Sequence, residues 1–176
     1  AAEVTGAKKV FVEEEPKVAA VGAGLDISLP SASMVIDIGG GTTDIAILSL
    51  GDIVTSKSIR VAGDLLNQEI IKYVKNKYKL LIGERTAEEI KIEIGTVYPD
   101  SKKGKKMIKG RDLITGLPNS ITISSKEVQE ALKDTIYKII YAAKSVLEET
   151  MPELSADIVN NGIVVTGGGA LIDGID

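Results

Sequence analysis

Short apolar runs separated by glycines dominate the first 61 residues of the chain. Lys8–Glu13 (KKVFVE) contains an apolar run of strand type, and Pro16 suits the first turn of a helix over Lys17–Ala23. A further apolar run predicts a buried strand at Ser33–Ile38 (SMVIDI), followed by a second strand at Thr43–Leu50 (TDIAILSL) and a third at Ile53–Val61. Because Gly39–Gly41 and Gly51-Asp52 are turn sequences between these runs, we expect an antiparallel meander.

From residue 63 onwards the spacing of the apolar positions is helical. Gly63-Asp64 open a first helix, with Asp64 as the expected N-cap, and a second helix covers about Thr86–Val97. The lysine-rich stretch Lys102–Lys109 (KKGKKMIK) is expected at the tip of a hairpin that pairs Met107–Leu113 with Ser120–Ser124.

A capping box formed by Ser124 and Glu127 predicts the start of a long helix that ends before Pro152. The buried stripe of this helix is expected to comprise Val128, Leu132, Ile136, Ile139, Ala143 and Leu147. Gly162–Thr166 (GIVVT) then indicates a last buried strand, which Gly167–Gly169 turn toward a further helix.

These elements predict an α/β fold with a mixed sheet, in which the antiparallel glycine-turn meander is flanked by helices. We divide the 176 residues into a first part of a core lobe (1–71), a small inserted subdomain (72–124) and a second part of the core lobe (125–176). Ala1–Gly6 (AAEVTG) lacks an initiator methionine and resembles the tail of a helix, so we expect the chain to be part of a longer protein.

The composition limits the chemistry that the chain can perform. It contains no cysteine and no histidine, which excludes disulfides, thiolate metal sites and imidazole bases. The net charge of −4 gives no electrostatic reason to expect nucleic acid as a partner. No apolar run approaches the roughly 18 residues of a membrane helix, and no signal peptide opens the chain. A cytoplasmic protein is therefore expected.

The strongest chemical signal is Asp37–Asp44 (DIGGGTTD), between two apolar strands. Three glycines at a hairpin tip leave backbone N–H groups able to approach an anion closely, as phosphate binding requires. Asp37 can hold a hydrated Mg²⁺, and the Thr42 hydroxyl can donate to a terminal phosphate. The loop is not of the Walker type, since GxxxxGK[ST] is absent and the glycines join two strands. The alternative is a tight hairpin without a ligand.

A carboxylate directly precedes the helix-starting proline in Glu13-Glu14-Glu15-Pro16. At the end of a strand, Glu15 could orient a water that attacks a γ-phosphate. The same four residues could equally be a solvated acidic turn.

Two weaker signals concern the nucleoside. Thr166–Ala170 (TGGGA) places glycines after a strand, where ribose or phosphate can pack on backbone, and we expect it to face the same cleft as the first glycine cluster. Glu88 and Lys91 could hydrogen-bond adenine and ribose, or could form a surface ion pair. The lysine-rich stretch is either a solvated hairpin tip or a contact for an anionic lipid or partner.

Four segments in this order resemble the MreB family of bacterial actin-like proteins, within the superfamily of actin and the heat-shock-chaperone ATPases. They are EEPKVAAVGAG, SMVIDIGGGTTDIAILSL, LIGERTAEEIKIEIGTVYP and GIVVTGGGALIDGID. The likeness covers nearly the whole chain and corresponds to the second, C-terminal-side lobe. It implies an actin-like (ribonuclease H-like) ATPase lobe, ATP or ADP with Mg²⁺ as ligands, self-association into protofilaments and a role in cell shape. For the complete protein it also implies other cytoskeletal or cell-shape proteins as partners, and attachment to the inner membrane surface through segments outside this chain.

The resemblance also assigns roles to individual residues. Glu15 matches the family's water-positioning glutamate, and Asp37 matches the aspartate that lies near the metal and would hold it through water. The residues matched to phosphate and adenosine contacts are Gly39, Gly40, Gly41, Thr42, Gly63, Asp64, Glu88, Glu89, Ile90, Lys91, Gly167, Gly168, Gly169 and Ala170.

The sequence departs from the family pattern in two places. Ala62 stands where relatives usually have a second glycine, and the family's first phosphate loop is not in this chain. We therefore expect about half of the nucleotide cleft, and little or no ATPase activity from the chain alone. A sugar or acetate kinase and a chaperone ATPase domain of the same superfamily are the alternatives. ATP-dependent pelleting of the complete protein, with and without a sugar or a peptide client, would distinguish them.

Overall fold

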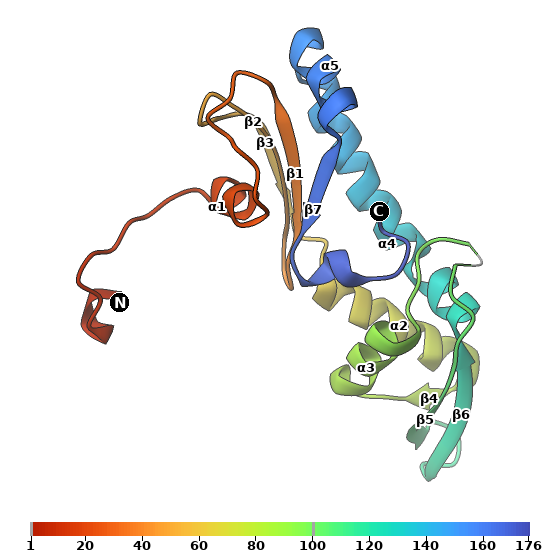
Figure 1. Ribbon diagram of the computed structural model, residues 1–176. Helices are drawn as coiled ribbons and strands as arrows, with labels where there is room; N and C mark the ends of the chain where they lie inside the picture. Colours follow the sequence, from red (N-terminus) through yellow and green to blue (C-terminus); the bar gives the residue numbers. More distant parts are fainter. Residues whose placement is uncertain (1, 100) are drawn as a thin grey trace.

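The first of two sheets is mixed and has the strand order β3-β2-β1-β7 (Figure 1). The structure, a computed structural model, describes residues 2–99 and 101–176. The antiparallel meander β1-β2-β3 is confirmed, and β7 pairs parallel with β1. The bounds of these strands are β1 Ser33–Ile38, β2 Thr43–Ser49, β3 Asp52–Ile59 and β7 Ile163–Thr166.

Helices cover both faces of this sheet. α1 (Glu15–Gly22) packs Ala20 in a small cluster with Val35 of β1. The long helix α4 (Ser125–Glu148) lies against the opposite face, where Ile36 belongs to the main hydrophobic cluster. Because side chains alternate along a strand, neighbouring positions of β1 are divided between the two clusters.

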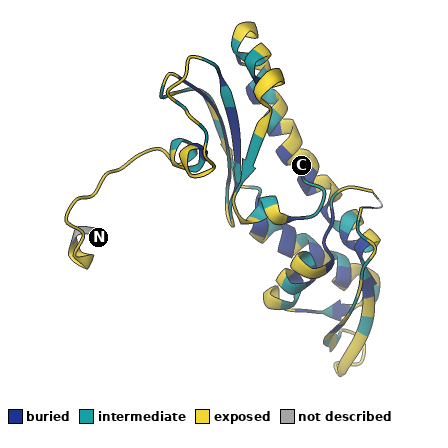
Figure 2. Ribbon diagram, in the orientation of Figure 1, coloured by how far each residue is buried: buried dark blue, intermediate teal, exposed yellow. Residues whose placement is uncertain are grey.

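The second sheet has the order β4-β5-β6 and is antiparallel throughout. The main cluster includes Ile45 of the first sheet and Ile108 and Ile123 of the second, so one core joins the two sheets. Buried positions therefore extend along the whole length of the two-sheet body (Figure 2). The remaining elements are η1 Ala2–Thr5, α2 Gly63–Tyr78, β4 Leu80–Leu81, α3 Glu84–Ile94, β5 Lys105–Asp112, β6 Pro118–Ser124, α5 Pro152–Asn161 and the 3₁₀ helix η2 Gly168–Leu171.

The predicted capping box is confirmed at the start of α4. Glu127 accepts hydrogen bonds from the backbone N–H (2.9 Å) and the hydroxyl (2.7 Å) of Ser124, and the Ser124 side chain caps the first turn. Most of the predicted stripe is buried, but Ala143 and Leu147 are only partly buried, and Ala142 and Val146 are buried in addition.

The predicted strand at Lys8–Glu13 and the predicted N-cap at Asp64 are both wrong. Lys8–Glu13 is not a strand, and its Phe11 and Val12 are 86% and 93% exposed, because no neighbouring strand pairs with it. Asp64 is not the N-cap of α2; Ala62 takes that place in an extended conformation, and Asp64 lies inside the first turn.

The lysine-rich stretch is also placed differently from the prediction. Lys105–Lys109 belong to β5 itself, and the hairpin turn lies at residues 113–117. Asp112 organises this turn, since its carboxylate accepts the N–H groups of Ile114 (2.8 Å) and Thr115 (2.9 Å). The tip therefore presents apolar side chains rather than lysines, with Ile114 82% and Leu117 65% exposed.

The end of the chain differs in two respects. β7 is an edge strand whose residues are exposed or half-buried, so the prediction of a buried strand is wrong. The helix α5, which Pro152 begins, was not predicted. We keep residues 72–124 as a proposed subdomain, although α2 (Gly63–Tyr78) continues across its first boundary at residue 72. None of the helices in the described part of the chain combines the length and apolar composition that a membrane crossing requires.

Candidate functional site

The tip of the β1–β2 hairpin is held against the start of α2. The Gly39 N–H donates to the Thr42 carbonyl (2.9 Å), which closes the turn. The carbonyls of Gly39 and Gly40 accept the N–H groups of Gly63 (3.0 Å) and Asp64 (2.8 Å), which are first-turn donors of α2. The carbonyl side of the tip is thus directed to the helix.

The other side of the tip carries backbone donors. Within residues 2–99 and 101–176, the N–H groups of Gly40 and Gly41 donate to no partner, and both residues are exposed. Neither glycine has a positive φ. Their lack of a side chain therefore serves close approach rather than an unusual backbone conformation, which is what an anion-binding turn requires.

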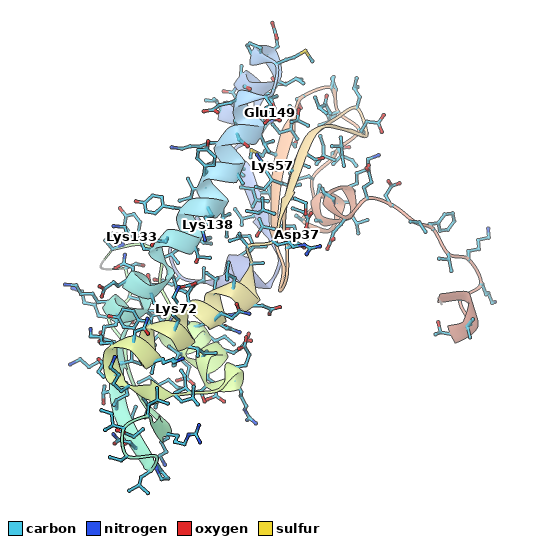
Figure 3. All side chains as sticks on the ribbon, turned by 180° about the vertical axis from the view of Figure 1, so that it is seen from behind. Asp37, Lys57, Lys72, Lys133, Lys138 and Glu149 are labelled. Carbon is cyan, nitrogen blue, oxygen red and sulfur yellow. The ribbon has the colours of Figure 1, made fainter. Side chains whose placement is uncertain are left out.

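The second glycine turn, between β7 and η2, packs on the end of β1. Gly167 has φ +85°, and a Cβ there would overlap the Ile38 carbonyl. A Cβ at Gly169 would overlap the Ile38 side chain. The Asp37 carboxylate lies beside Gly167 and accepts no hydrogen bond from the residues that the structure describes. Figure 3 shows Asp37 near the end of the first sheet.

Two charged side chains of α3 complete the site. Lys91 Nζ lies 3.5 Å from Glu88 Oε1 and donates to the Gly63 carbonyl (3.3 Å). Asn67 of α2 donates through Nδ2 to Glu88 Oε2 (3.0 Å). The Asn67 hydrogen bond, with the charge of Lys91, lowers the pKa of Glu88 below its usual value. Glu88 is therefore a carboxylate at neutral pH.

These elements enclose one cavity of about 410 Å³, a volume within the usual range for small-ligand sites. The two glycine clusters line the same cavity, as the sequence predicted. The lining residues are Gly39, Gly40, Gly63, Asp64, Leu66, Glu88, Lys91, Ile92, Gly168, Gly169, Leu171 and Ile172. The cavity thus combines glycine backbone, two carboxylates, one ammonium group and an apolar wall.

Several sequence-predicted residues do not line this cavity. Ile90 is fully buried in the core, and Glu89 pairs on another side of α3 with Arg85 (3.2 Å) and Lys106 (4.0 Å). The other residues outside the lining are Glu15, Asp37, Gly41, Thr42, Gly167 and Ala170.

Residues that sequence reasoning missed are mainly apolar. Leu66, Ile92, Leu171 and Ile172 line the cavity, and buried Asn67 donates a hydrogen bond to Glu88. Apolar residues at helical spacing predict only a core, and no sequence pattern distinguishes a core position from a cavity wall.

Glu15 lies apart from the cavity, at the first turn of α1. Its neighbours Glu13 and Glu14 pair with Lys17 at 3.7 Å and 3.6 Å, whereas Glu15 makes no ion pair with the described residues. α1 packs on the face of β1 that carries Val35, and Asp37 follows two positions later, on the same face. Glu15 and Asp37 therefore belong to one side of the sheet.

Comparison with known proteins matches the whole chain, residues 1–176, to the family described as MreB/Mbl protein. The chain is 60% identical over 176 residues to the cell shape-determining protein Mbl of Bacillus subtilis, covering all of this chain and 53% of that protein. It is 47% identical over 175 residues to the cell shape-determining protein MreB of Escherichia coli, covering 99% of this chain and 50% of that protein. The chain thus spans about half the length of these relatives.

Solved structures agree with this result. The crystal structure of MreB5 of Spiroplasma citri bound to AMPPNP superposes with a TM-score of 0.93 and 48% identity, over 98% of this chain and 52% of that chain. A filament of MamK, at 23% identity and a TM-score of 0.69, shares the fold. The mixed sheet with helices on both faces is thus the actin-like α/β fold of the MreB structures. By its sequence over all 176 residues and by its fold, the chain belongs to the MreB/Mbl family.

Proposed function

We propose that this chain is the nucleotide-binding lobe of an ATP-dependent, filament-forming actin-like protein of the cell-shape cytoskeleton. The observation that carries the proposal is that both glycine turns, together with Glu88 and Lys91, line the same cavity. In support, the crystal structures of MreB5 of Spiroplasma citri are bound to AMPPNP and to ADP, and this chain covers 52% of the chain in each. The site in this chain would accept adenosine and part of the phosphate chain.

Each part of the site suits one part of a nucleotide. The exposed N–H groups of Gly40 and Gly41 would donate to phosphate oxygens. Glu88 accepts hydrogen bonds and Lys91 donates them, so the pair suits a sugar with hydroxyl groups or a base with mixed edges. Leu171 and Ile92 supply apolar surface for a planar base.

Mg²⁺ fits the residues present at the phosphate end. Mg²⁺ keeps several waters and takes only one or two carboxylates together with phosphate oxygens. Asp37 offers one carboxylate without a hydrogen-bond donor among the described residues, and in that part of the chain no group of three carboxylates is placed to hold a metal ion by itself. Asp37 would hold the ion through water, and the ion would neutralise phosphate charge.

Hydrolysis by the complete protein would use Glu15. Its unpaired carboxylate can accept a proton or a hydrogen bond from the water that attacks the terminal phosphate. We propose a cytoplasmic protein at the inner face of the membrane, acting with other cell-shape proteins.

A pair of glycine variants tests the cavity by titration calorimetry of ATP–Mg²⁺ into the complete protein. A Cβ at Gly168 would meet nothing within 4 Å, and Gly168 lines the cavity, so Gly168→Leu should fold normally and bind at least about tenfold more weakly. Gly169→Ala, which overlaps Ile38, should instead lower the stability by about 1–3 kcal/mol. Unchanged affinity in Gly168→Leu would place the nucleotide elsewhere.

Self-association would join opposite ends of the molecule. The turn of the β5–β6 hairpin lies at one end and α5 at the other (Figure 1). The hairpin end exposes Ile114 and Leu117, and the hairpin, residues 105–124, contains four basic side chains and one acidic side chain, Asp112. The α5 end has an apolar hollow that includes Val159 and Ile163, and residues 145–162 contain acidic but no basic side chains. Complementary surfaces at opposite ends form a head-to-tail contact, which propagates into a filament.

A charged side chain placed in one of these apolar surfaces should prevent assembly. Val159 is 84% exposed, so Val159→Asp should leave the fold intact and abolish ATP-dependent pelleting of the complete protein. Val54→Asp, at a side chain 40% exposed on β3, is the control and should pellet like the wild type. Normal pelleting of Val159→Asp would remove the α5 end from the contact.

A further inference from the structure

Asn67 is a buried amide with an unusual balance of hydrogen bonds. It lies on α2, is 1% exposed, and donates through Nδ2 to Glu88 Oε2 at 3.0 Å. Its Oδ1 atom is buried and has no partner among the described residues. A buried acceptor without a partner costs free energy, so the fold alone gives no reason for an amide at this position.

The orientation of this amide follows from its neighbour. Turning the amide over would place Oδ1 against the Glu88 carboxylate, two acceptors facing each other, so the donor orientation holds. Asn67 thus donates a hydrogen bond to the Glu88 carboxylate on the cavity wall, while its own Oδ1 remains without a donor among the described residues.

Glu88 is held from two sides. Asn67 reaches Oε2, and Lys91 lies 3.5 Å from Oε1 while also bonded to the Gly63 carbonyl. The Glu88 side chain is 49% exposed, so without these contacts it would sample several rotamers in solvent. The two contacts do not use all the lone pairs of the carboxylate, and Glu88 lines the cavity, so the remaining lone pairs are available to a ligand there.

We infer that Asn67 is a positioning residue that fixes the Glu88 carboxylate as an acceptor for a donor group of the bound nucleoside. This inference rests on the proposed nucleotide site and deepens it. A carboxylate only accepts hydrogen bonds, so its partner on the ligand is a sugar hydroxyl or the amino group of the base. Preorganisation of this acceptor before binding raises affinity for ligands that carry the donor.

The test uses Asn67→Asp, which has nearly the same shape but replaces the donor by a second carboxylate. The ligands are ADP, 2′-deoxy-ADP, 3′-deoxy-ADP and inosine diphosphate, titrated into the complete protein at pH 7.5. The wild type should bind ADP about tenfold more tightly than the analogue that lacks the recognised donor. Asn67→Asp should bind ADP about tenfold more weakly and lose this discrimination. Whichever analogue the wild type rejects identifies the donor as sugar hydroxyl or base amine.

A pH series adds a readout that simple loss of packing does not give. Two adjacent carboxylates share a proton at a raised pKa, and the shared proton restores a donor toward Glu88. ADP affinity of Asn67→Asp should therefore recover toward wild type between about pH 7.5 and pH 5.5, relative to the wild-type profile. The wild-type profile corrects for Asp64 and Lys91, the other charged groups that line the cavity. Asn76→Asp, at an exposed site of the same helix, is the matched control and should bind ADP normally.

Failure of the inference and failure of the proposed function give different results. If the wild type binds none of the four nucleotides, the proposed function is wrong. Two results with a wild type that binds would show that Asn67 has no positioning role. In the first, Asn67→Asp and Asn67→Ala bind ADP as tightly as the wild type does. In the second, both variants lose affinity by the same factor for all four nucleotides. Should Asn67→Asp fail to fold, Asn67→Ala decides by the same ratio.

Discussion

Glu15→Ala in the complete protein is expected to slow ATP hydrolysis by about 10²–10⁴-fold while changing ATP affinity little. A carboxylate that positions or deprotonates water acts mainly in the transition state, where such assistance contributes a factor of this size. Within the acidic run, Glu15 is the suitable member because Lys17 pairs with Glu13 and Glu14. Phosphate release under single-turnover conditions measures the chemical step, and titration calorimetry measures the affinity.

The control is Glu14→Ala, one residue earlier. Glu14 is 64% exposed at its side chain and makes an exposed ion pair with Lys17, so its loss should change neither turnover nor affinity by more than about twofold. Equal losses of affinity and turnover in Glu15→Ala would make Glu15 a binding residue instead.

The largest effect on stability is expected for Glu127→Ala, about 2–4 kcal/mol at pH 7, summed over hydrogen bonds to a charged group and a lost helix cap. Glu127 accepts hydrogen bonds from Ser124 and Tyr78, and lies 2.8 Å from Lys77 Nζ. These contacts join the end of α2 to the start of α4, and the Glu127 side chain is only 17% exposed. Urea unfolding followed by far-UV circular dichroism measures the difference.

The stability from Glu127 should depend on pH in a defined direction. Burial would raise the pKa of Glu127, but the donors Lys77, Tyr78 and Ser124 outweigh burial and lower that pKa from 4.5 to about 2. A group with a lowered folded-state pKa stabilises the fold above its unfolded pKa. Its contribution is therefore complete above about pH 4.5 and is lost as the pH falls toward about 2.

The difference in unfolding free energy between wild type and Glu127→Ala should thus shrink over this pH range. Glu130→Ala is the matched control on the same helix: Glu130 is exposed and accepts only from Tyr73 (2.8 Å), so its loss should cost less than about 1 kcal/mol. A wild-type-to-Glu127→Ala difference that stays constant from pH 6 to pH 2.5 would contradict the assigned role.

Much of the fold follows from local signals in the sequence. The apolar runs at Ser33–Ile38 and Thr43–Leu50 are strands in the structure because each is a continuous apolar run of strand length, and a glycine turn follows each of them. The capping box at Ser124 and Glu127 was recognisable because both of its hydrogen bonds are made within three residues. Such features need no information from distant parts of the chain.

Tertiary structure decided the features that depend on distant partners. Lys8–Glu13 has the composition of a strand but lacks a neighbouring strand to supply its ladder hydrogen bonds. The register of the β5–β6 hairpin depends on Asp112 and its turn, so the lysines lie along β5 instead of at the tip. The β7 strand is apolar in sequence, yet its place at the sheet edge leaves it half-exposed.

The candidate site divides in the same way. The sequence by itself determined the family and both glycine clusters, because close approach of backbone to a ligand requires glycine whatever surrounds it. Only the tertiary structure decided which side chains complete the cavity. Asn67 and Glu88 are 21 residues apart on different helices, and their hydrogen bond exists because α2 and α3 pack together. A side chain's neighbours across helices are set by packing of the whole core, which no local pattern specifies.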